Sequence, residues 1–363
     1  MWTTGKEQPV SASWGFRHML RSPPEAEGHG TRKMDEPLTL HLGVLKNREG
    51  GNTGKHGSGL WRDEYLKNRY LKHATHEELT NRLDDSFVNM IRFTDEGKAV
   101  VRTPVEKHPL AALFGHVLHE LGLRGAGDYA FSVKSLHFDD TAYPNVRSAA
   151  ELWRGRNLKP GSYMLKFGKL KYLEHLLNNG EMRVCPASFY REPSLVSAIR
   201  DDELQFTQTV HGGTVKIQDH DGTWRTASTV GPVLLTHAAN SDYYLSCYSV
   251  LFENRLFDDF NADGCLIIKD MDRFGSCLRN AVRAVLPEWN CFAGGVGYRD
   301  PYFPTKDPNV VFTKHFRYSY QRELRIIWGP PKPQENLTPI HVRMGDLSSF
   351  CELLRLDYAS ATH

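Results

Sequence analysis

The stretch FTKHFRYSYQRELRIIW, which runs from Phe312 to Trp328, decides how the second half of this chain folds. Its first part is rich in aromatic and basic residues. Its last part, Leu324–Trp328, is an apolar run of β-forming residues that ends at Gly329-Pro330-Pro331. Glu323 therefore lies where a polar segment passes into a buried strand. A carboxylate in this position, among arginines and tyrosines, is either an active-site group or half of a structural ion pair.

The composition is that of a folded protein with room for two ordinary domains. The chain has 363 residues, of which 40% are hydrophobic, and a net charge of +2, so the whole molecule is not an obvious nucleic-acid binder. No apolar run approaches the roughly 20 residues that span a bilayer, and no secretory signal is recognisable. The six cysteines form no C-x-x-C pair. We therefore expect a cytoplasmic protein with reduced thiols, no membrane partner and no metal.

The first half of the sequence predicts a mainly α-helical N-terminal domain over residues 34–158, which sets specificity or holds a partner. Residues 1–33 mix glycine, proline, serine and charges without periodicity. They are expected to be disordered, or to precede the true start of the protein at Met34. The segment Arg154–Gly161, which ends in a Pro-Gly pair, is the predicted boundary to a second domain.

Two amphipathic helices are predicted in this half. Thr75-His-Glu-Glu78 is a capping box, and apolar residues recur every four positions after it as far as Ile91. The second helix begins near Pro109 and is expected to end before Gly122. The other expected elements are strands at residues 38–45 and 129–133 and a short helix at residues 147–153.

Two further motifs in this half are interpreted as structural. The glycine-rich stretch Arg48–Gly59 has the wrong spacing for a phosphate-binding loop and is predicted to be a flexible surface loop. A His-x-x-His-Glu pattern occurs twice, with histidines three apart rather than the four that place both on one zinc ion. We expect surface or capping histidines in both copies: His73, His76 and Glu77, and His116, His119 and Glu120.

Beyond the boundary, short strands and helices alternate, which predicts an α+β domain over residues 160–355 with a mixed, split sheet and surrounding helices. The expected strands are residues 163–167, 182–185, 204–210, 214–218, 223–227, 233–236, 243–249, 264–269, 310–313, 324–328 and 340–342. The expected helices are residues 170–177, residues 254–260, one capped by Asp270 and a last one that begins at Asp346.

The order of landmarks in this domain resembles a bacterial family, the domain of unknown function twenty-nine seventy-one. The matching segments are Tyr163-Met-Leu-Lys-Phe167, Leu176-Leu-Asn-Asn-Gly-Glu-Met-Arg183, Pro186-Ala-Ser-Phe189, Asp201-Asp-Glu203, Ser246-Cys-Tyr-Ser249, Asp263-Gly-Cys-Leu-Ile-Ile268, Val296-Gly-Tyr298 and Tyr320-Gln-Arg-Glu-Leu-Arg325. The resemblance covers about half of the chain. Two departures are the missing Asn-Asp-Pro after the Ser-Phe turn, and Gln321 in place of the first acid of Glu-x-Glu.

The triplet Gln321-Arg322-Glu323 also resembles the [Gln/Glu]-x-Glu element of ADP-ribosyltransferases, which build an NAD pocket from three strands. This resemblance implies that Glu323 is catalytic, that Gln321 orients the acceptor and that NAD is the substrate. The acceptor, a protein or a nucleic acid, stays open. A bacterial defence or toxin role would suit such an enzyme by association. The residues expected to line the pocket are Tyr163, Lys166, Ser188, Tyr190, Ser246, Tyr248 and Ser249.

Three alternatives remain open from the sequence. The first is a structural ion pair between Glu323 and its arginine neighbours, with the serines of 246–249 in a core strand. The second is a non-catalytic nucleotide or nucleic-acid binding module, in which basic and aromatic residues of the segments 159–172 and 314–325 grip a ligand by charge and stacking. The third is a metal-dependent nuclease that uses Asp201, Asp202 and Glu203.

Overall fold

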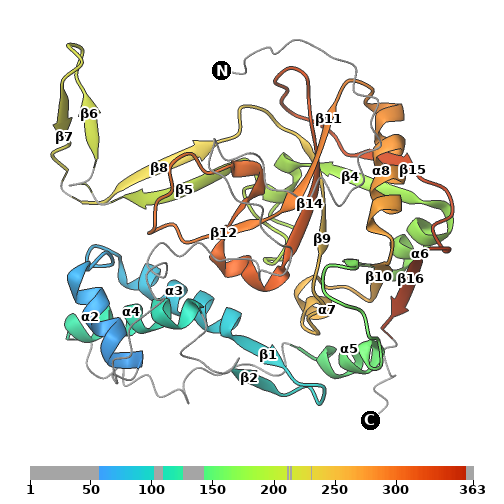
Figure 1. Ribbon diagram of the computed structural model, residues 1–363, viewed down its shortest axis with the longest axis horizontal. Coiled ribbons are helices and arrows are strands. Elements are labelled where there is room, and N and C mark those ends of the chain that lie inside the picture. Colours follow the sequence, from blue (N-terminus) through green and yellow to red (C-terminus); the bar gives the residue numbers. More distant parts are fainter. Residues whose placement is uncertain are drawn as a thin grey trace.

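The computed structural model describes residues 57–101, 109–125, 143–210, 212, 215–229 and 231–356. The expectations for residues 1–33, for the strands at 38–45 and 129–133 and for most of the glycine-rich stretch lie outside these residues. The α+β class is confirmed, because helices surround an eight-stranded sheet (Figure 1). No helix within the described ranges is long and apolar enough to cross a membrane.

The helices and the strands of the large sheet follow the predicted segments closely in most places. The α-helices are α2 (Gly57–Lys67), α3 (His76–Met90), α4 (Pro109–Leu123), α5 (Val146–Trp153), α6 (Leu170–Asn179), α7 (Leu256–Asp259) and α8 (Met271–Val285). Short 3₁₀ helices cover Ala187–Arg191, Val310–Phe312 and Phe316–Gln321. The large sheet contains β3 (Met164–Gly168), β4 (Glu181–Pro186), β9 (Tyr244–Ser249), β10 (Gly264–Ile268), β11 (Asn290–Gly295), β14 (Glu323–Gly329), β15 (Ile340–Arg343) and β16 (Cys351–Arg355).

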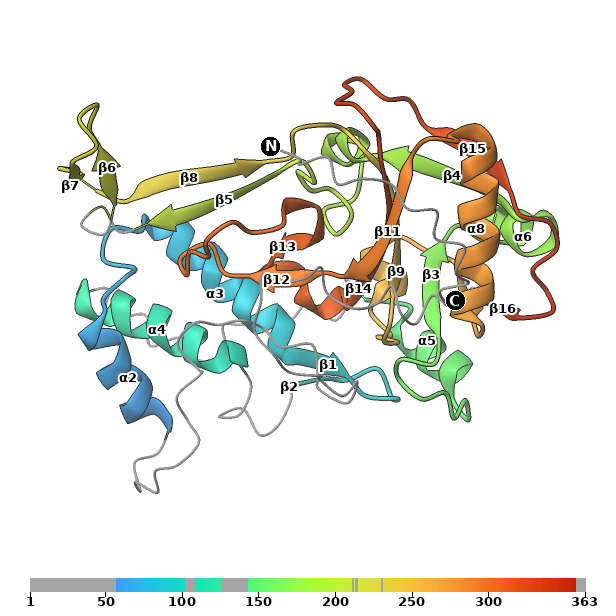
Figure 2. The same cartoon turned by 45° about the horizontal axis from the view of Figure 1, so that its top comes forward.

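The remaining strands form four two-stranded sheets within the described residues. These strands are β1 (Ile91–Phe93), β2 (Ala99–Val101), β5 (Gln205–Val210), β6 (Lys216–Gln218), β7 (Trp224–Thr226), β8 (Val233–Ala238), β12 (Gly297–Arg299) and β13 (Thr313–His315). The β5–β8 ribbon carries the β6–β7 hairpin at its end, and Figures 1 and 2 show this arm projecting from the body. The hairpin turns at Gly222, whose φ of 84° suits a residue without a Cβ.

The large sheet is split at its centre, as the sequence predicts. Its strands follow the order β11-β14-β9-β3-β10-β16, and every pair in it is antiparallel. On one edge of β9, Tyr244 and Leu245 pair with β4, whereas Ser249 pairs with β3. The intervening residues 246–248 have no strand partner on this edge in the described chain. The prediction of a mixed sheet is therefore wrong for the large sheet, and the parallel pair among the described residues, β12–β13, is separate from it.

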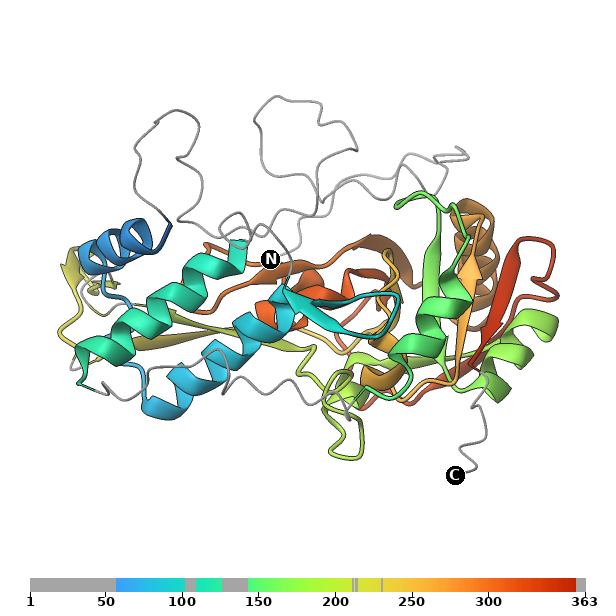
Figure 3. The same ribbon diagram turned by 90° about the horizontal axis from the view of Figure 1, so that it is seen from below.

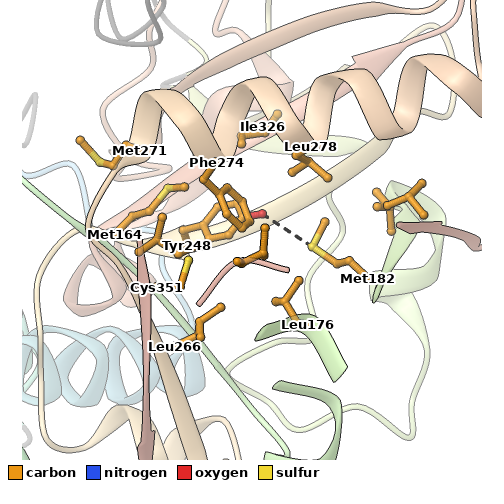
Figure 4. Close-up of a cluster of buried hydrophobic side chains, with 14 of the residues drawn as sticks. Met164, Leu176, Met182, Tyr248, Leu266, Met271, Phe274, Leu278, Ile326 and Cys351 are labelled. Atoms are coloured by element: carbon orange, nitrogen blue, oxygen red, sulfur yellow. Dashed lines mark hydrogen bonds between the residues drawn. The ribbon is translucent and has the colours of Figure 1, made fainter. Parts of the chain in front are cut away.

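Two apolar clusters hold helices on the faces of this sheet. On one face, α6 and α8 pack on β3, β9, β10 and β14. Figure 4 shows Phe274 and Leu278 of α8 beside Tyr248, and the Tyr248 and Phe274 rings meet edge to face with centroids 5.6 Å apart. On the opposite face, Ala149 of α5 and Phe257 of α7 pack on Leu165 and other residues of β3 and β10. Helix α8 begins where the sequence predicts, since the Asp270 side chain accepts a hydrogen bond from the Arg273 amide at 2.9 Å.

The helices α2–α4 lie at one end of the molecule and the α8-covered part of the sheet at the other (Figure 3). The capping box of α3 forms as predicted, with both the Thr75 and the Glu78 side chains bonded to backbone amides. These helices are joined to the later chain by a buried ion pair between Arg82 and Asp300, with Nη1 and Oδ1 2.7 Å apart. Phe316 adds an apolar contact to the same helices. The division into two domains stays a prediction.

Some local predictions are wrong, and each fails for a tertiary reason. The last predicted helix does not form. Asp346 instead accepts hydrogen bonds from Ser348, and Cys351–Arg355 becomes β16, which pairs along the whole of β10. The predicted strand at residues 310–313 is a 3₁₀ turn that leads into β13. Gly122 lies inside α4, and Gly57–Gly59 begin α2 rather than extend a loop.

Candidate functional site

A cavity of about 180 Å³ lies beside the split of the large sheet. It is bounded by β3, β9 and β14, which are neighbours in the sheet and are the three strands that the sequence assigned to a pocket. Six of the nine predicted site residues line this one cavity: Lys166, Tyr190, Tyr248, Ser249, Gln321 and Glu323. The other lining residues are Leu165, Phe167, Gly168, Ala198, Ile199, Glu203, Cys247, Phe260 and Lys314.

Glu323 opens β14 and is held by two cations. Its Oε1 accepts a hydrogen bond from Arg325 Nε at 2.6 Å, and its Oε2 accepts one from Lys314 Nζ at 3.0 Å. The Arg325 contact follows from the sequence, because side chains two apart in a strand lie on the same face. The Glu323 amide is also fixed, since it donates to the Tyr298 hydroxyl oxygen at 2.8 Å.

Glu203 closes this ion pair into a network of two carboxylates and two cations. Glu203 Oε1 lies 3.4 Å from Lys314 Nζ, and Glu203 Oε2 lies 2.5 Å from Arg325 Nη2. None of the four residues is more than 5% exposed. Burial of four charges is tolerable only because they neutralise one another, so the loss of any one leaves an uncompensated charge.

The network fixes the ionisation of Glu323. Burial by itself would raise the pKa of this carboxyl, but Arg325 and Lys314 outweigh burial and lower the pKa to about 2. Glu323 is therefore a carboxylate at neutral pH and a poor proton acceptor. Nearby Asp201 behaves in the opposite way: burial and the neighbouring Glu203 raise its pKa to about 6.

Lys166 is the cation of the cavity that lacks an acidic partner within the described chain. Its Nζ lies 3.4 Å from Ser246 Oγ, 3.5 Å from the Cys247 carbonyl oxygen and 4.9 Å from the centre of the Tyr248 ring. The split explains this position, because the ammonium group reaches an edge of β9 that no strand covers. Burial lowers the pKa of Lys166, and an anion bound beside the ammonium group would counteract this effect by favouring the charged form.

The hydroxyl groups at the cavity differ in their availability. Ser249 Oγ donates to the Gln321 carbonyl oxygen at 2.8 Å. The Tyr248 hydroxyl accepts from Ser246 Oγ and is directed at the Met182 sulfur, as the dashed line in Figure 4 shows. The Tyr190 hydroxyl, in contrast, has no hydrogen-bond partner among the described residues. Tyr190 is thus the hydroxyl most open to a ligand.

The Gln321 side chain is not oriented to position an acceptor, which is the role that the sequence suggested. Its Nε2 donates to the Ala198 carbonyl oxygen at 2.7 Å, and its Oε1 lies 3.4 Å from Lys314 Nζ. The side chain is 3% exposed. It therefore holds the loop around Ala198 against the network, although it still lines the cavity.

Three predicted site residues do not line the cavity. Tyr163 precedes β3, and its ring packs in the apolar cluster beneath α5, 5.5 Å from the Trp153 ring centre. Ser188 is bound by Asp242, which accepts hydrogen bonds from both its hydroxyl and its amide. Ser246 contacts Lys166 but points into the α8 side of the sheet with Tyr248. Strand alternation places Ser246 and Tyr248 on the face of β9 opposite Ser249, and of these two only Tyr248 lines the cavity.

The residues that the binding-module and nuclease hypotheses require do not come together in the structure as those hypotheses expect. Lys314 and Arg325 form ion pairs with buried carboxylates, so their charges are not available to bind the phosphates of a nucleic acid. The acidic run diverges: Asp202 pairs with Arg191 and Glu203 enters the buried network, and no cluster of three metal-binding side chains occurs in the described ranges. The nuclease hypothesis therefore gains no support from the geometry.

The two histidine motifs differ: His73, His76 and Glu77 are exposed, as expected, whereas the expected surface position is wrong for His116 and Glu120, which are buried. His116 is buried, with Nδ1 3.2 Å from the Tyr70 hydroxyl, and burial lowers its pKa to about 4. Glu120 of the same motif is held by Arg69 and Arg124 at 2.7 Å each. These contacts explain the motif as a helix-packing network.

The partners of Glu323 could be found only in part from the sequence. Arg325 was recognisable from its spacing, whereas Glu203 is 120 positions upstream and looked like one member of an acidic run. Comparisons with protein-family models, curated proteins and solved structures find no match. The resemblance to the twenty-nine seventy-one family stays a prediction.

Proposed function

We propose that the protein is an ADP-ribosyltransferase-like enzyme that cleaves the nicotinamide–ribose bond of NAD. The observation that carries the proposal is the meeting of β3, β9 and β14 at the split of the sheet. These strands bring Lys166, Ser249 and Glu323 to one cavity, although the three residues are far apart in the sequence. A cation, a polar strand and a carboxylate in this order match the three-strand pocket expected from the sequence.

The size of the cavity fits one end of a dinucleotide. Its volume of about 180 Å³ is below the roughly 300–1,000 Å³ of pockets that enclose drug-sized ligands. We infer that it receives the nicotinamide and its ribose, while the phosphates extend outward past Lys166. The ammonium group, which lacks an acidic partner in the described chain, would then be paired by phosphate.

The chemistry of cleavage suits the ionised state of Glu323. The bond between C1′ and the nicotinamide nitrogen breaks, its electron pair goes to the nicotinamide, and positive charge develops on the ribose. A fixed carboxylate stabilises that charge without reorganisation. Each carboxylate oxygen has two acceptor positions, so Glu323 retains capacity for a ribose hydroxyl beside its bonds to Arg325 and Lys314.

Glu323 acts in this scheme as an electrostatic stabiliser and not as a general base. A group with a pKa of about 2 takes up a proton poorly near pH 7. The acceptor attacks C1′, forms the new bond and releases its proton to solvent. When water is the acceptor, the products are ADP-ribose, nicotinamide and a proton. The Tyr190 hydroxyl, which has no hydrogen-bond partner among the described residues, would hydrogen-bond the substrate.

The proposal is tested by measuring nicotinamide release from NAD by liquid chromatography. Glu323→Gln is expected to reduce kcat by about 100-fold or more, the usual loss when one preorganised electrostatic group is removed. Tyr190→Phe removes a hydroxyl that is unpaired in the described chain, so it should raise KM while the protein stays folded. Circular dichroism at the assay temperature establishes that each variant is folded.

Glu352→Gln is the matched control, because Glu352 is an ion-paired carboxylate on β16 outside the cavity. It should leave nicotinamide release unchanged. Addition of a chelator should also leave the rate unchanged. The proposal would be refuted if the wild-type protein released no nicotinamide, or if folded Glu323→Gln released it at the wild-type rate.

A further inference from the structure

A second, larger groove opens next to the cavity. Its volume is about 1,160 Å³, and its walls are α6, β4 and β15. It shares Lys166, Phe167 and Gly168 with the cavity, so the two meet at the split of the sheet. The shared residues belong to β3, so a molecule in the groove would lie against a strand that also lines the cavity.

The groove concentrates positive charge. It is lined by four lysine or arginine residues and two histidines, against the single carboxylate of Glu181. That carboxylate is already paired, with Arg343 at 2.7 Å and His175 at 3.4 Å. The whole chain, in contrast, has 45 basic and 43 acidic residues. The basic residues of the groove are Lys166, Lys169, His175, Arg183, His341 and Arg343.

The secondary structure places these side chains in two rows. In the β4–β15 pair, Arg183 lies opposite His341, and Glu181 lies opposite Arg343. Positions two apart in a strand share a face, so these side chains project together. On α6, Tyr172 and His175 are three apart and lie on one side of the helix.

The floor of the groove is apolar and its rim is polar. Leu176, Met182 and Val342 form part of the floor and are each at most 5% exposed. Tyr172 on the rim is 64% exposed, and Lys171 Nζ lies 4.8 Å from its ring centre. An exposed aromatic ring beside cations and above an apolar floor is a surface on which a base can stack while its phosphate is neutralised.

We propose that this groove binds single-stranded nucleic acid, which is the acceptor of the ADP-ribosyl group. The groove cations other than Lys166, which is assigned to the phosphates of NAD, would contact the nucleic-acid phosphates, and the Tyr172 ring would stack on a base that a duplex keeps buried. The groove volume of about 1,160 Å³ lies just above the roughly 300–1,000 Å³ of small-molecule pockets, and its several cations suit a ligand with several phosphates. The acceptor role rests on the proposed transferase activity, whereas the binding does not.

Binding is measured by the fluorescence anisotropy of labelled single-stranded DNA and RNA oligonucleotides over a range of salt concentrations. Tyr172→Ala is expected to weaken binding by about 5- to 150-fold, since one stacked base contributes that much. Arg183→Gln combined with Arg343→Gln should lower the slope of log K against log salt by about 0.7 for each lost phosphate contact. The same oligonucleotide as a duplex should bind more weakly.

Lys216→Gln is the control, because Lys216 is an exposed base on β6, at the opposite end of the molecule from α6 (Figure 1). It should leave affinity and salt slope unchanged. Equal affinity for the wild-type protein and the groove variants would overturn the inference. So would complete displacement of the oligonucleotide by ADP-ribose, because the groove would then belong to the dinucleotide.

Transfer is tested separately with NAD that carries a label in its adenosine part. Label that appears on the oligonucleotide with the wild-type protein, and disappears with Tyr172→Ala while nicotinamide release continues, supports the acceptor role. If the protein binds the oligonucleotide but releases no nicotinamide, the transferase proposal is refuted and the proposal that the groove binds nucleic acid is retained. Nicotinamide release without oligonucleotide binding refutes the groove and leaves the transferase intact.

Discussion

Glu323→Gln tests the buried network as a source of stability, independently of catalysis. The substitution keeps the shape of the side chain and removes its charge. Lys314 and Arg325 are then left with Glu203 alone, so one positive charge stays buried without compensation. Removal of one partner of a buried ion pair typically costs about 3–5 kcal/mol.

The lowered pKa of Glu323 leads to an expected loss of stability of similar size. The pKa of Glu323 falls from 4.5 to about 2 in the folded protein, which at 1.36 kcal/mol per unit corresponds to about 3 kcal/mol of stability. Because the folded pKa is below the unfolded one, this contribution is complete above about pH 4.5 and is lost as the pH falls toward 2. Glu323→Gln should therefore lower the stability at pH 7 and flatten its decline in that acid window.

The measurement is urea unfolding followed by circular dichroism at several pH values. Glu181→Gln is the comparison, because its carboxylate is 33% exposed and its ion pairs should contribute only about 0–1 kcal/mol. Adding Lys314→Met to Glu323→Gln restores a neutral set of charges and should cost about 0.5–3 kcal/mol less than the two single changes together. A loss below about 1 kcal/mol for Glu323→Gln at pH 7 would refute the picture of a desolvated network.

The other predictions concern single contacts, and each is checked by chemical denaturation. Thr75→Ala removes the capping box of α3 and should cost about 1 kcal/mol. Asp300→Asn leaves Arg82 buried beside an uncharged partner and should cost about 3–5 kcal/mol, whereas Asp300→Leu combined with Arg82→Met should recover most of that loss. Lys166→Met removes a desolvated cation, so it should keep or raise the stability at pH 7, by up to about 1 kcal/mol, while it weakens NAD binding. A lower stability of Lys166→Met would show that the ammonium group is paired in the folded protein.

The helices of this protein could be predicted because their signals are local. The Thr75 capping box and the Asp270 cap use residues three apart, and both form. Gly180 ends α6 in the left-handed conformation, with a φ of 64°, as the Asn-Asn-Gly sequence indicates. Signals contained within one turn of chain are present in the sequence whatever the rest of the molecule does.

The positions of strands could be predicted only where the apolar pattern was compatible with a strand and not with a helix or a loop. The apolar spacing after Asp346 favours a helix, yet β16 forms because the free edge of β10 offers partners to Cys351–Arg355. Strands β11 and β12 were missed because short runs interrupted by glycine carry a weak pattern. In both cases a distant strand supplied the hydrogen bonds that decided the outcome.

In the candidate site, too, some features follow from local sequence and others depend on contacts between distant segments. The sequence by itself determined that Glu323 and Arg325 share a face and that the two lie at the start of a buried strand. Only the tertiary structure decided that Glu203 and Lys314 complete a neutral network and that Lys166 reaches the uncovered edge of β9. The physical reason is that burial and neutralisation depend on every charge within a few ångströms, and most of those charges come from distant parts of the chain.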